Sequence, residues 1–265
     1  MPEKKRIFEL DFLRGLALLA MCFDHFCFDC TLLPDGFPRL LTNNGSSIPG
    51  ALFQFGNWFF HSTLRQIGHN VFATLFLLLA GIGCTLSHSI FRKAGRTALG
   101  AICITAVTGM ITLLADLDVL IVFGILHSMT IAFLLYAILS KLRDNRWVYL
   151  AAGLLIVAVG IGIQWNEAPV CVVLTWDTVW RIALGTLSYG ADWFPIFPTV
   201  GIVLVGAFLG KTLYSDRRSL LSDRPYRWAR PICVLGRHSL WIYLLHQPLL
   251  AGMLFVFCVL FGAGR

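Results

Sequence analysis

Long apolar stretches separated by short polar segments recur along this chain, and they limit what it can fold into. Seven of them approach the length of about 20 residues that a helix needs to cross a bilayer. Only 13% of the 265 residues are charged, whereas a soluble domain carries about 25%. The sequence therefore predicts an all-α, polytopic membrane helix bundle with about seven transmembrane helices, formed by a single domain over residues 1–265. The expected spans are about 10–28, 70–90, 98–115, 119–140, 147–164, 194–211 and 233–261.

Two further apolar segments are too short or too charged to cross a membrane. Residues 48–61, IPGALFQFGNWFFH, are apolar and aromatic, and we expect them to lie at the membrane interface. The second segment, residues 170–180, lies in a loop that also holds Asp177 and Arg181. These two charges favour a surface helix over an eighth span.

Lysine and arginine are distributed unequally between the segments that join the predicted spans. With the N-terminus inside, fifteen of the 21 fall in inner segments and four in outer ones. This asymmetry follows the positive-inside rule, so we expect a cytoplasmic N-terminus. The net charge of +7 sits in short loops, which argues against a nucleic-acid partner. Topology explains most of the inner charges, although they could also hold phosphates of a cytosolic nucleotide or coenzyme.

The eight cysteines are scattered and lie mostly inside the predicted spans. We therefore expect neither a zinc site nor a redox motif, and no metal. Cys30 and Cys171 both fall in segments predicted to lie outside, which makes them candidates for a disulfide.

The first predicted span contains four ionisable residues, Asp11, Arg14, Asp24 and His25. Such groups are costly inside a membrane, so they mark a functional site or a buried pair. Arg14 and His25 are 11 residues apart, which on an α-helix is about three turns and a rise of roughly 16 Å. Both therefore share one face, with Asp11 one turn before Arg14. A structural Asp11–Arg14 ion pair is the simpler interpretation, but it leaves His25 unexplained.

Polar residues recur in the other predicted spans and beside them. A single histidine in a membrane helix can be a core residue that is bonded to a backbone carbonyl. Several histidines at middle or outer depth favour a shared polar cavity, where histidine can take up and return a proton. In the last span, three of these polar residues fall within about 60° of one another on a helical wheel. The residues are His61, His69, Asn70 and His127, with Ser239, Tyr243 and His246 in the last span.

Five motifs along the chain together resemble those of one enzyme family. In order they are LDFLRGLALLAMCFDHF, FLLLAGIGCTLS, FGILHSMTIAFLL, FPIFPTVGIVLVGAFLGK and LGRHSLWIYLLHQPLL. The chain resembles the bacterial relatives of the heparan-α-glucosaminide N-acetyltransferase catalytic domain over nearly its whole length. That family is similar to the broader transmembrane acyltransferases, which carry an Arg, ten residues and then a His in their first conserved span. Arg14 and His25 match that spacing.

The resemblance implies that an acyl group, expected to be acetyl, passes from cytosolic acyl-CoA to an extracytoplasmic sugar or glycan. The reaction needs a base for the acceptor and hydrogen-bond donors for the oxyanion. His25 matches the catalytic His of the broader superfamily. In the animal lysosomal enzyme the matching position resembles an Asn, and the catalytic His follows an aromatic segment, where His61 is the nearest match. We favour His25 as the base, with His61 as the second candidate.

The resemblance and the polar stripe together suggest the remaining roles. Asp11 is expected to pair with Arg14, while Arg14 and Arg237 neutralise phosphate or oxyanion charge, and Asn70 donates a hydrogen bond to the oxyanion. The other residues expected to bind donor or acceptor are Asp24, His127, Ser239, Tyr243 and His246. The predicted enzyme is an acetyl-CoA-dependent N- or O-acetyltransferase of the bacterial cytoplasmic (inner) membrane. A homo-oligomer is left open.

Two other classes of function remain open at this point. A proton-coupled transporter or channel for a small solute would use the same histidine-lined stripe as a proton relay. A structural membrane protein would bury the polar residues as contacts only. Binding of acyl-CoA separates the enzyme from both alternatives.

Overall fold

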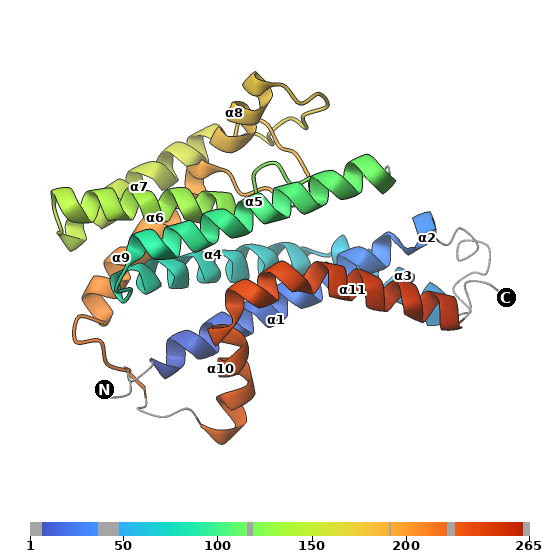
Figure 1. Ribbon diagram of the computed structural model, residues 1–265, viewed down its shortest axis with the longest axis horizontal. Helices are drawn as coiled ribbons and strands as arrows, with labels where there is room; N and C mark the ends of the chain where they lie inside the picture. Colours follow the sequence, from blue (N-terminus) through green and yellow to red (C-terminus); the bar gives the residue numbers. More distant parts are fainter. Residues whose placement is uncertain (1–6, 37–47, 116–118, 191, 222–225, 262–265) are drawn as a thin grey trace. The chain divides into compact units, whose positions relative to one another are not determined.

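The computed structural model describes residues 7–36, 48–115, 119–190, 192–221 and 226–261, and helices account for most of them (Figure 1). The helices are α1 (Phe8–Thr31), α2 (Leu33–Gly36), α3 (Ile48–Phe60), α4 (Thr63–Thr85), α5 (Ile90–Ala115), α6 (Ile125–Leu142), α7 (Arg146–Ile163), α8 (Trp176–Leu184), α9 (Ile196–Leu213), the 3-10 turn η2 (Arg227–Ala229), α10 (Arg230–Arg237) and α11 (Ser239–Phe261). The prediction of an all-α polytopic membrane bundle is confirmed.

Six of these helices are long and apolar enough to cross a membrane, namely α4, α5, α6, α7, α9 and α11. The predicted first span, 10–28, lies inside α1, which is 24 residues long but carries five charged residues. Its charge, rather than its length, separates α1 from the six. The seventh crossing therefore stays a prediction.

The boundaries differ from the expected spans at two places. The predicted span 70–90 begins earlier, because α4 starts at Thr63. The predicted last span, 233–261, is divided at His238 between α10 and α11, while Pro248 lies inside the continuous α11. The first short apolar segment forms α3, which has 13 residues. The second is not helical at 170–175, and its last residues begin α8, which has nine residues. At 1.5 Å per residue, neither reaches across a hydrocarbon core of about 30 Å.

The described residues divide into two compact units. Among these residues, the first unit contains Ile7 and the range 77–220, and the second contains the ranges 8–76 and 221–261. Helix α4 contributes its first half to the second unit and its last turns to the first. The expectation of a single domain over residues 1–265 stays a prediction.

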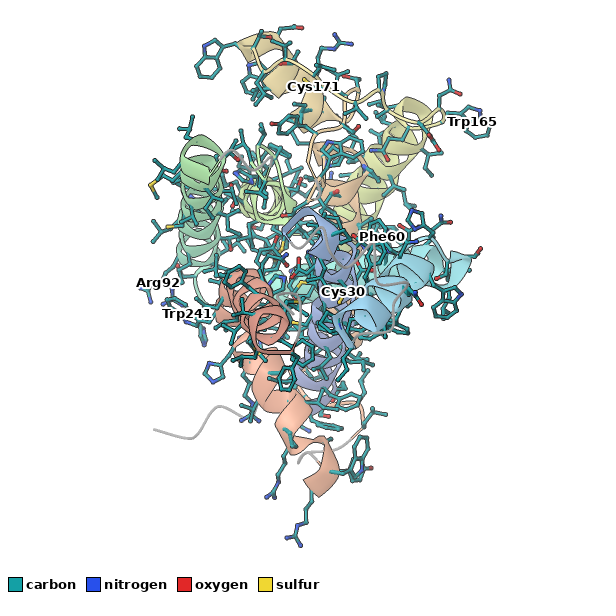
Figure 2. The ribbon with its side chains drawn as sticks, turned by 90° about the vertical axis from the view of Figure 1, so that its right-hand side faces the viewer. Cys30, Phe60, Arg92, Trp165, Cys171 and Trp241 are labelled. Atoms are coloured by element: carbon teal, nitrogen blue, oxygen red, sulfur yellow. The ribbon has the colours of Figure 1, made fainter. Side chains whose placement is uncertain are left out.

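The first unit is built on α9, which packs against α7 and α6, while α5 packs against α6. In Figure 1, α5, α6 and α7 run alongside one another. The buried side chains of Phe133, Tyr149 and Leu204 fill the space between these helices. Large apolar side chains also face outward. Trp165, for example, is 80% exposed and points away from the helices (Figure 2), as expected for a residue at a membrane surface.

The second unit is built on α1, which packs against α3, α10 and α11. At one end, Phe8 of α1 is buried with Ala229 and Cys233. Further along α1, Cys30 is buried against Leu254 of α11. The helix expected to carry the polar stripe is thus packed against three other helices of its own unit.

Candidate functional site

Two of the predicted site histidines meet in the second unit. The ring centroids of His25 on α1 and His246 on α11 are 4.8 Å apart, with the planes at 84°. The Nδ1 atom of His25 lies 2.9 Å from the carbonyl oxygen of Met21, and that of His246 lies 2.8 Å from the carbonyl oxygen of Tyr243. A carbonyl oxygen can only accept, so in each neutral ring Nδ1 donates its proton and Nε2 keeps a lone pair.

This histidine pair has two polar neighbours that sequence reasoning missed. Gln247 Nε2 donates a hydrogen bond of 2.6 Å to Asp29 Oδ1. The signal was present in the sequence, since Asp29 is one helical turn after His25 and Gln247 follows His246 directly. Asp29 and His246 are buried, and His25 and Gln247 are partly buried. These four residues are called the histidine cluster below.

Three buried atoms of the histidine cluster have no hydrogen-bond partner within the described residues: His246 Nε2, Asp29 Oδ2 and Gln247 Oε1. An unsatisfied buried polar atom costs about 1–3 kcal/mol. Native proteins keep such groups where a ligand, an ordered water or a chemical step uses them. The histidine cluster therefore has the properties of a site for a polar group, with an imidazole nitrogen, His246 Nε2, that no described residue contacts through a hydrogen bond.

A second polar cluster joins α1 to α4 within the second unit. Arg65 donates to both oxygens of Asp24, from Nε at 2.7 Å and from Nη2 at 3.1 Å, and His69 Nδ1 lies 3.4 Å from Asp24 Oδ2. The guanidinium of Arg65 also lies 4.1 Å from the ring centroid of Phe60. Arg65 was not among the predicted residues. Its bidentate bond holds the first turn of α4 against α1, and Ser62 caps that turn by accepting the backbone N–H of Arg65 at 3.2 Å.

We expect Arg65→Gln to destabilise the protein by about 2 kcal/mol. Loss of one partner of a buried ion pair costs about 3–5 kcal/mol, and here the side chains of Arg65 and Asp24 remain 21% and 14% exposed. Thermal unfolding in detergent measures the change. Arg143→Gln, at an exposed position, is the matched control, and adding Asp24→Asn to Arg65→Gln should recover part of the loss. Equal unfolding temperatures for Arg65→Gln and wild type would contradict this role.

The predicted Asp11–Arg14 contact is present and has a third member. Arg14 Nη1 lies 3.4 Å from Asp11 Oδ1, and Arg237 Nε donates to Asp11 Oδ2 at 3.2 Å. Asp11 is buried, and its two arginines come from α1 and from the end of α10. The three residues lie where α10 crosses α1, which supports the structural interpretation of this end of the stripe.

The other predicted residues are placed differently. His61 is exposed, with Nδ1 2.8 Å from the carbonyl oxygen of Asn57, and Asn70 is exposed on α4. Tyr243 lies beside His246, with ring centroids 5.8 Å apart, and Ser239 is the first residue of α11. The contacts of these four residues do not test a catalytic role, so the roles of His61 and Asn70 stay predictions.

His127 lies in the first unit and has both ring nitrogens occupied. Its Nδ1 accepts the backbone N–H of Gly124 at 3.1 Å, so the proton is on Nε2, which donates to Thr105 Oγ1 at 3.2 Å. His127 thus secures the start of α6. In this respect it differs from His246, whose Nε2 has no partner among the described residues.

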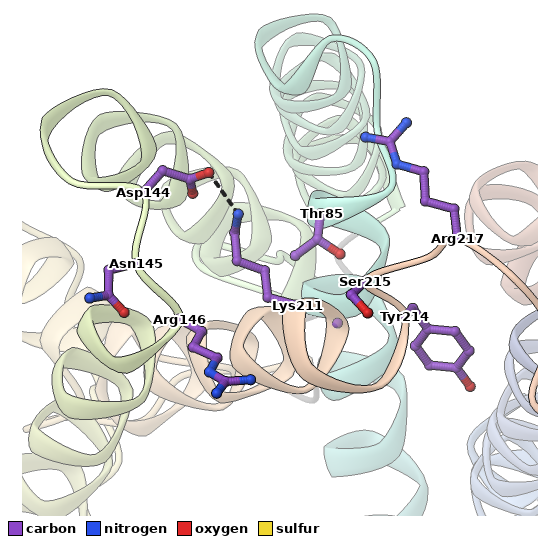
Figure 3. A pocket seen from close by; sticks show the side chains of 9 residues that line it. Thr85, Asp144, Asn145, Arg146, Lys211, Tyr214, Ser215 and Arg217 are labelled. Carbon is purple, nitrogen blue, oxygen red and sulfur yellow. Dashed lines mark hydrogen bonds and ion pairs between the residues drawn. The ribbon is translucent and has the colours of Figure 1, made fainter.

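A polar cavity of about 550 Å³ opens in the first unit, at the end of the helices where α4 and α9 finish and α7 begins (Figure 3). Lys211 donates a hydrogen bond of 2.7 Å to Asp144 Oδ2, and Tyr149 donates one of 2.7 Å to Asp144 Oδ1. Partial burial alone would raise the pKa of Asp144, but these two bonds and the Lys211 charge outweigh it and lower the pKa. The cavity is lined by Thr85, Asp144, Asn145, Arg146, Gly210, Lys211, Tyr214, Ser215 and Arg217, and we call it the basic pocket.

The cysteines correct one sequence interpretation. Cys27 and Cys30 form a Cys-x-x-Cys pair, which the description of the cysteines as scattered overlooked. Both are buried free thiols on α1. Cys171, the proposed partner of Cys30, is also a free thiol. Cys30 and Cys171 belong to different units, so a disulfide between them stays a prediction.

Comparison with known proteins gives one match. A family model described as "Heparan-alpha-glucosaminide N-acetyltransferase, catalytic" matches residues 51–248. No curated protein and no solved structure matches the chain. The matched range covers most of the chain, from α3 to the part of α11 that carries His246 and Gln247.

Proposed function

Because the chain belongs to the heparan-α-glucosaminide N-acetyltransferase catalytic family, a membrane acetyltransferase family, we propose that it transfers an acetyl group from cytosolic acetyl-CoA to an extracytoplasmic acceptor. The acceptor is a hydroxyl or amine of a sugar or glycan. The observation that carries the mechanism is the histidine cluster, where two imidazole rings meet and three buried polar atoms lack partners among the described residues. The membrane in which the protein acts is proposed to be the bacterial cytoplasmic membrane.

In this mechanism His25 is the general base. Its Nε2 lone pair takes the proton of the acceptor hydroxyl or amine while the acceptor oxygen or nitrogen attacks the thioester carbonyl carbon. The new bond to the acetyl carbon forms, the carbon–sulfur bond breaks, and the thiolate of CoA leaves and takes up the proton. His25 suits the role because Met21 fixes the tautomer that leaves Nε2 unprotonated.

The remaining members of the histidine cluster orient the acceptor. His246 Nε2 and the free oxygens of Asp29 and Gln247 are acceptor atoms, so they bind N–H or O–H groups. A sugar or amino sugar presents several such donors. The cluster therefore favours a polyhydroxylated acceptor over an apolar one.

Acceptor-dependent release of CoA tests the proposal. Purified protein in detergent, given acetyl-CoA and a panel of amino sugars and glycans, should release free thiol only when a suitable acceptor is present. The acetylated product, identified by its mass, shows whether nitrogen or oxygen accepts the group. Proton-coupled solute uptake into proteoliposomes without thioester cleavage would instead favour a transporter.

A further inference from the structure

The basic pocket carries more positive charge than the carboxylate in its lining neutralises. It contains three basic side chains, Arg146, Lys211 and Arg217, and a single carboxylate, Asp144. Asp144 is engaged by Lys211. Neither arginine forms an ion pair with a carboxylate anywhere in the described ranges, and both are exposed. Two guanidinium groups are thus available to a ligand.

The two arginines come from different elements of the first unit and border the same cavity (Figure 3). Arg146 is the first residue of α7, while Arg217 follows the end of α9. Arg217 has a φ of 54°, the left-handed region that a non-glycine residue rarely adopts. Such backbone conformations cluster at ligand sites and are held there by the surrounding structure.

The lining identifies the chemistry of the ligand. Pockets for drug-like molecules are mostly apolar, but here the side chains around the cavity are hydroxyls, an amide and charged groups. Arginine binds phosphate oxygens through two parallel N–H donors. The carbonyl ends of α4 and α9 and the amino end of α7 all reach this pocket, and its basic side chains add the positive charge that favours an anion.

We propose that the basic pocket is a phosphate-binding site that holds the phosphates of the acyl-CoA donor, with Arg146 and Arg217 as the two contacts. The site rests on the proposed function, because that function supplies a ligand with a diphosphate and a separate phosphate. The positive-inside prediction places this end of the helices in the cytoplasm, where the donor is found. Lys211 and Asp144 form the neighbouring wall and hold the loop before α7 to α9.

Direct binding tests the site without turnover. CoA binding to purified wild type, Arg146→Gln, Arg217→Gln and the double variant would be measured by calorimetry in detergent. A charge-assisted hydrogen bond contributes enough that each single variant should weaken CoA binding about tenfold, and the double variant more. Arg143→Gln and Arg218→Gln are the matched controls, because both are exposed neighbours that do not line the pocket. Thermal unfolding of each variant shows that the fold is retained.

Two further probes identify the source of the phosphate. CoA without its 3′-phosphate should bind wild type more weakly than CoA does. An anionic phospholipid headgroup offers the same chemistry, so binding of phosphatidylglycerol is measured in parallel. If the arginine variants weaken phosphatidylglycerol binding and leave CoA binding unchanged, the phosphate site stands and its assignment to the donor is overturned.

Failure of the phosphate site and failure of the acetyltransferase function would give different results. If the wild type and the double variant bind both CoA and phosphatidylglycerol equally, the pocket is not a phosphate site, while acetyl transfer is unaffected. If wild type binds no acyl-CoA and releases no thiol, the proposed acetyltransferase function fails. In that case loss of phosphatidylglycerol binding in the double variant still supports a phosphate site, and unchanged binding overturns it.

Discussion

Replacement of His25 with alanine is expected to reduce acetyl transfer by about 10²–10⁴-fold, the contribution of a positioned general base. The fold should survive, because His25 is only partly buried and its one hydrogen bond within the described residues goes to the carbonyl of Met21 on its own helix. The measurement is the rate of CoA thiol release at saturating acetyl-CoA and acceptor. Thermal unfolding and gel filtration confirm that the variant is folded.

Parallel variants separate the roles of the histidines. His246→Ala should also lower the rate, mainly through a higher KM for the acceptor if His246 orients it. His61→Ala tests the second candidate base, and His88→Ala, at an exposed histidine outside the proposed site, is the control. A fully active His25→Ala with an inactive His61→Ala would transfer the role of base to His61. Full activity in both would remove both from it.

A side chain at Gly81 or at Gly206 is expected to disrupt the first unit. The two glycines face each other where α4 crosses α9. A Cβ atom at Gly81 would overlap the backbone carbonyl oxygen of Val203 and lie 2.9 Å from the Cα of Gly206. A Cβ atom at Gly206 would overlap the carbonyl oxygen of Leu78. Backbone cannot move aside as a flexible side chain can, so the helices must separate.

Overpacking of a close contact costs about 1–3 kcal/mol and occasionally more. We expect Gly81→Val and Gly206→Val to exceed that range, with loss of monodisperse protein in detergent and a strongly lowered unfolding temperature. Gly95→Ala on α5 is the control, because a Cβ atom there meets nothing within 4 Å. Alanine should be neutral or slightly stabilising at that position, since it favours helix over glycine by about 1 kcal/mol. Wild-type stability in Gly81→Val would contradict the close crossing.

The fold class was readable in the sequence because bilayer crossing is a local requirement. About 20 consecutive apolar residues are needed, and their number and position can be counted along the chain. Six of the expected spans have a corresponding long apolar helix. The family was also readable, since its motifs are ordered along the chain and the family model matches residues 51–248.

Contacts between distant residues were not readable from the sequence. The first turn of α4 is held to α1 by the pairing of Arg65 with Asp24, 41 residues earlier. The division at His238 separates α11 from α10, a short helix that packs on α1 with Arg237 bonded to Asp11. A hydropathy profile over residues 233–261 shows one apolar run and does not indicate which helix each turn packs against.

In the candidate site, too, some features were predictable from the sequence and others depended on tertiary contacts. The sequence by itself determined that ionisable residues sit in apolar helices, and it named His25 and His246 separately, because the cost of a polar group in a membrane depends on its own surroundings. Only the tertiary structure decided that these two rings touch, that Asp29 and Gln247 complete the cluster across 218 residues, and that His127 is already occupied. Hydrogen bonds are short-ranged and directional, so which polar groups are paired and which remain free is fixed only when the helices have packed.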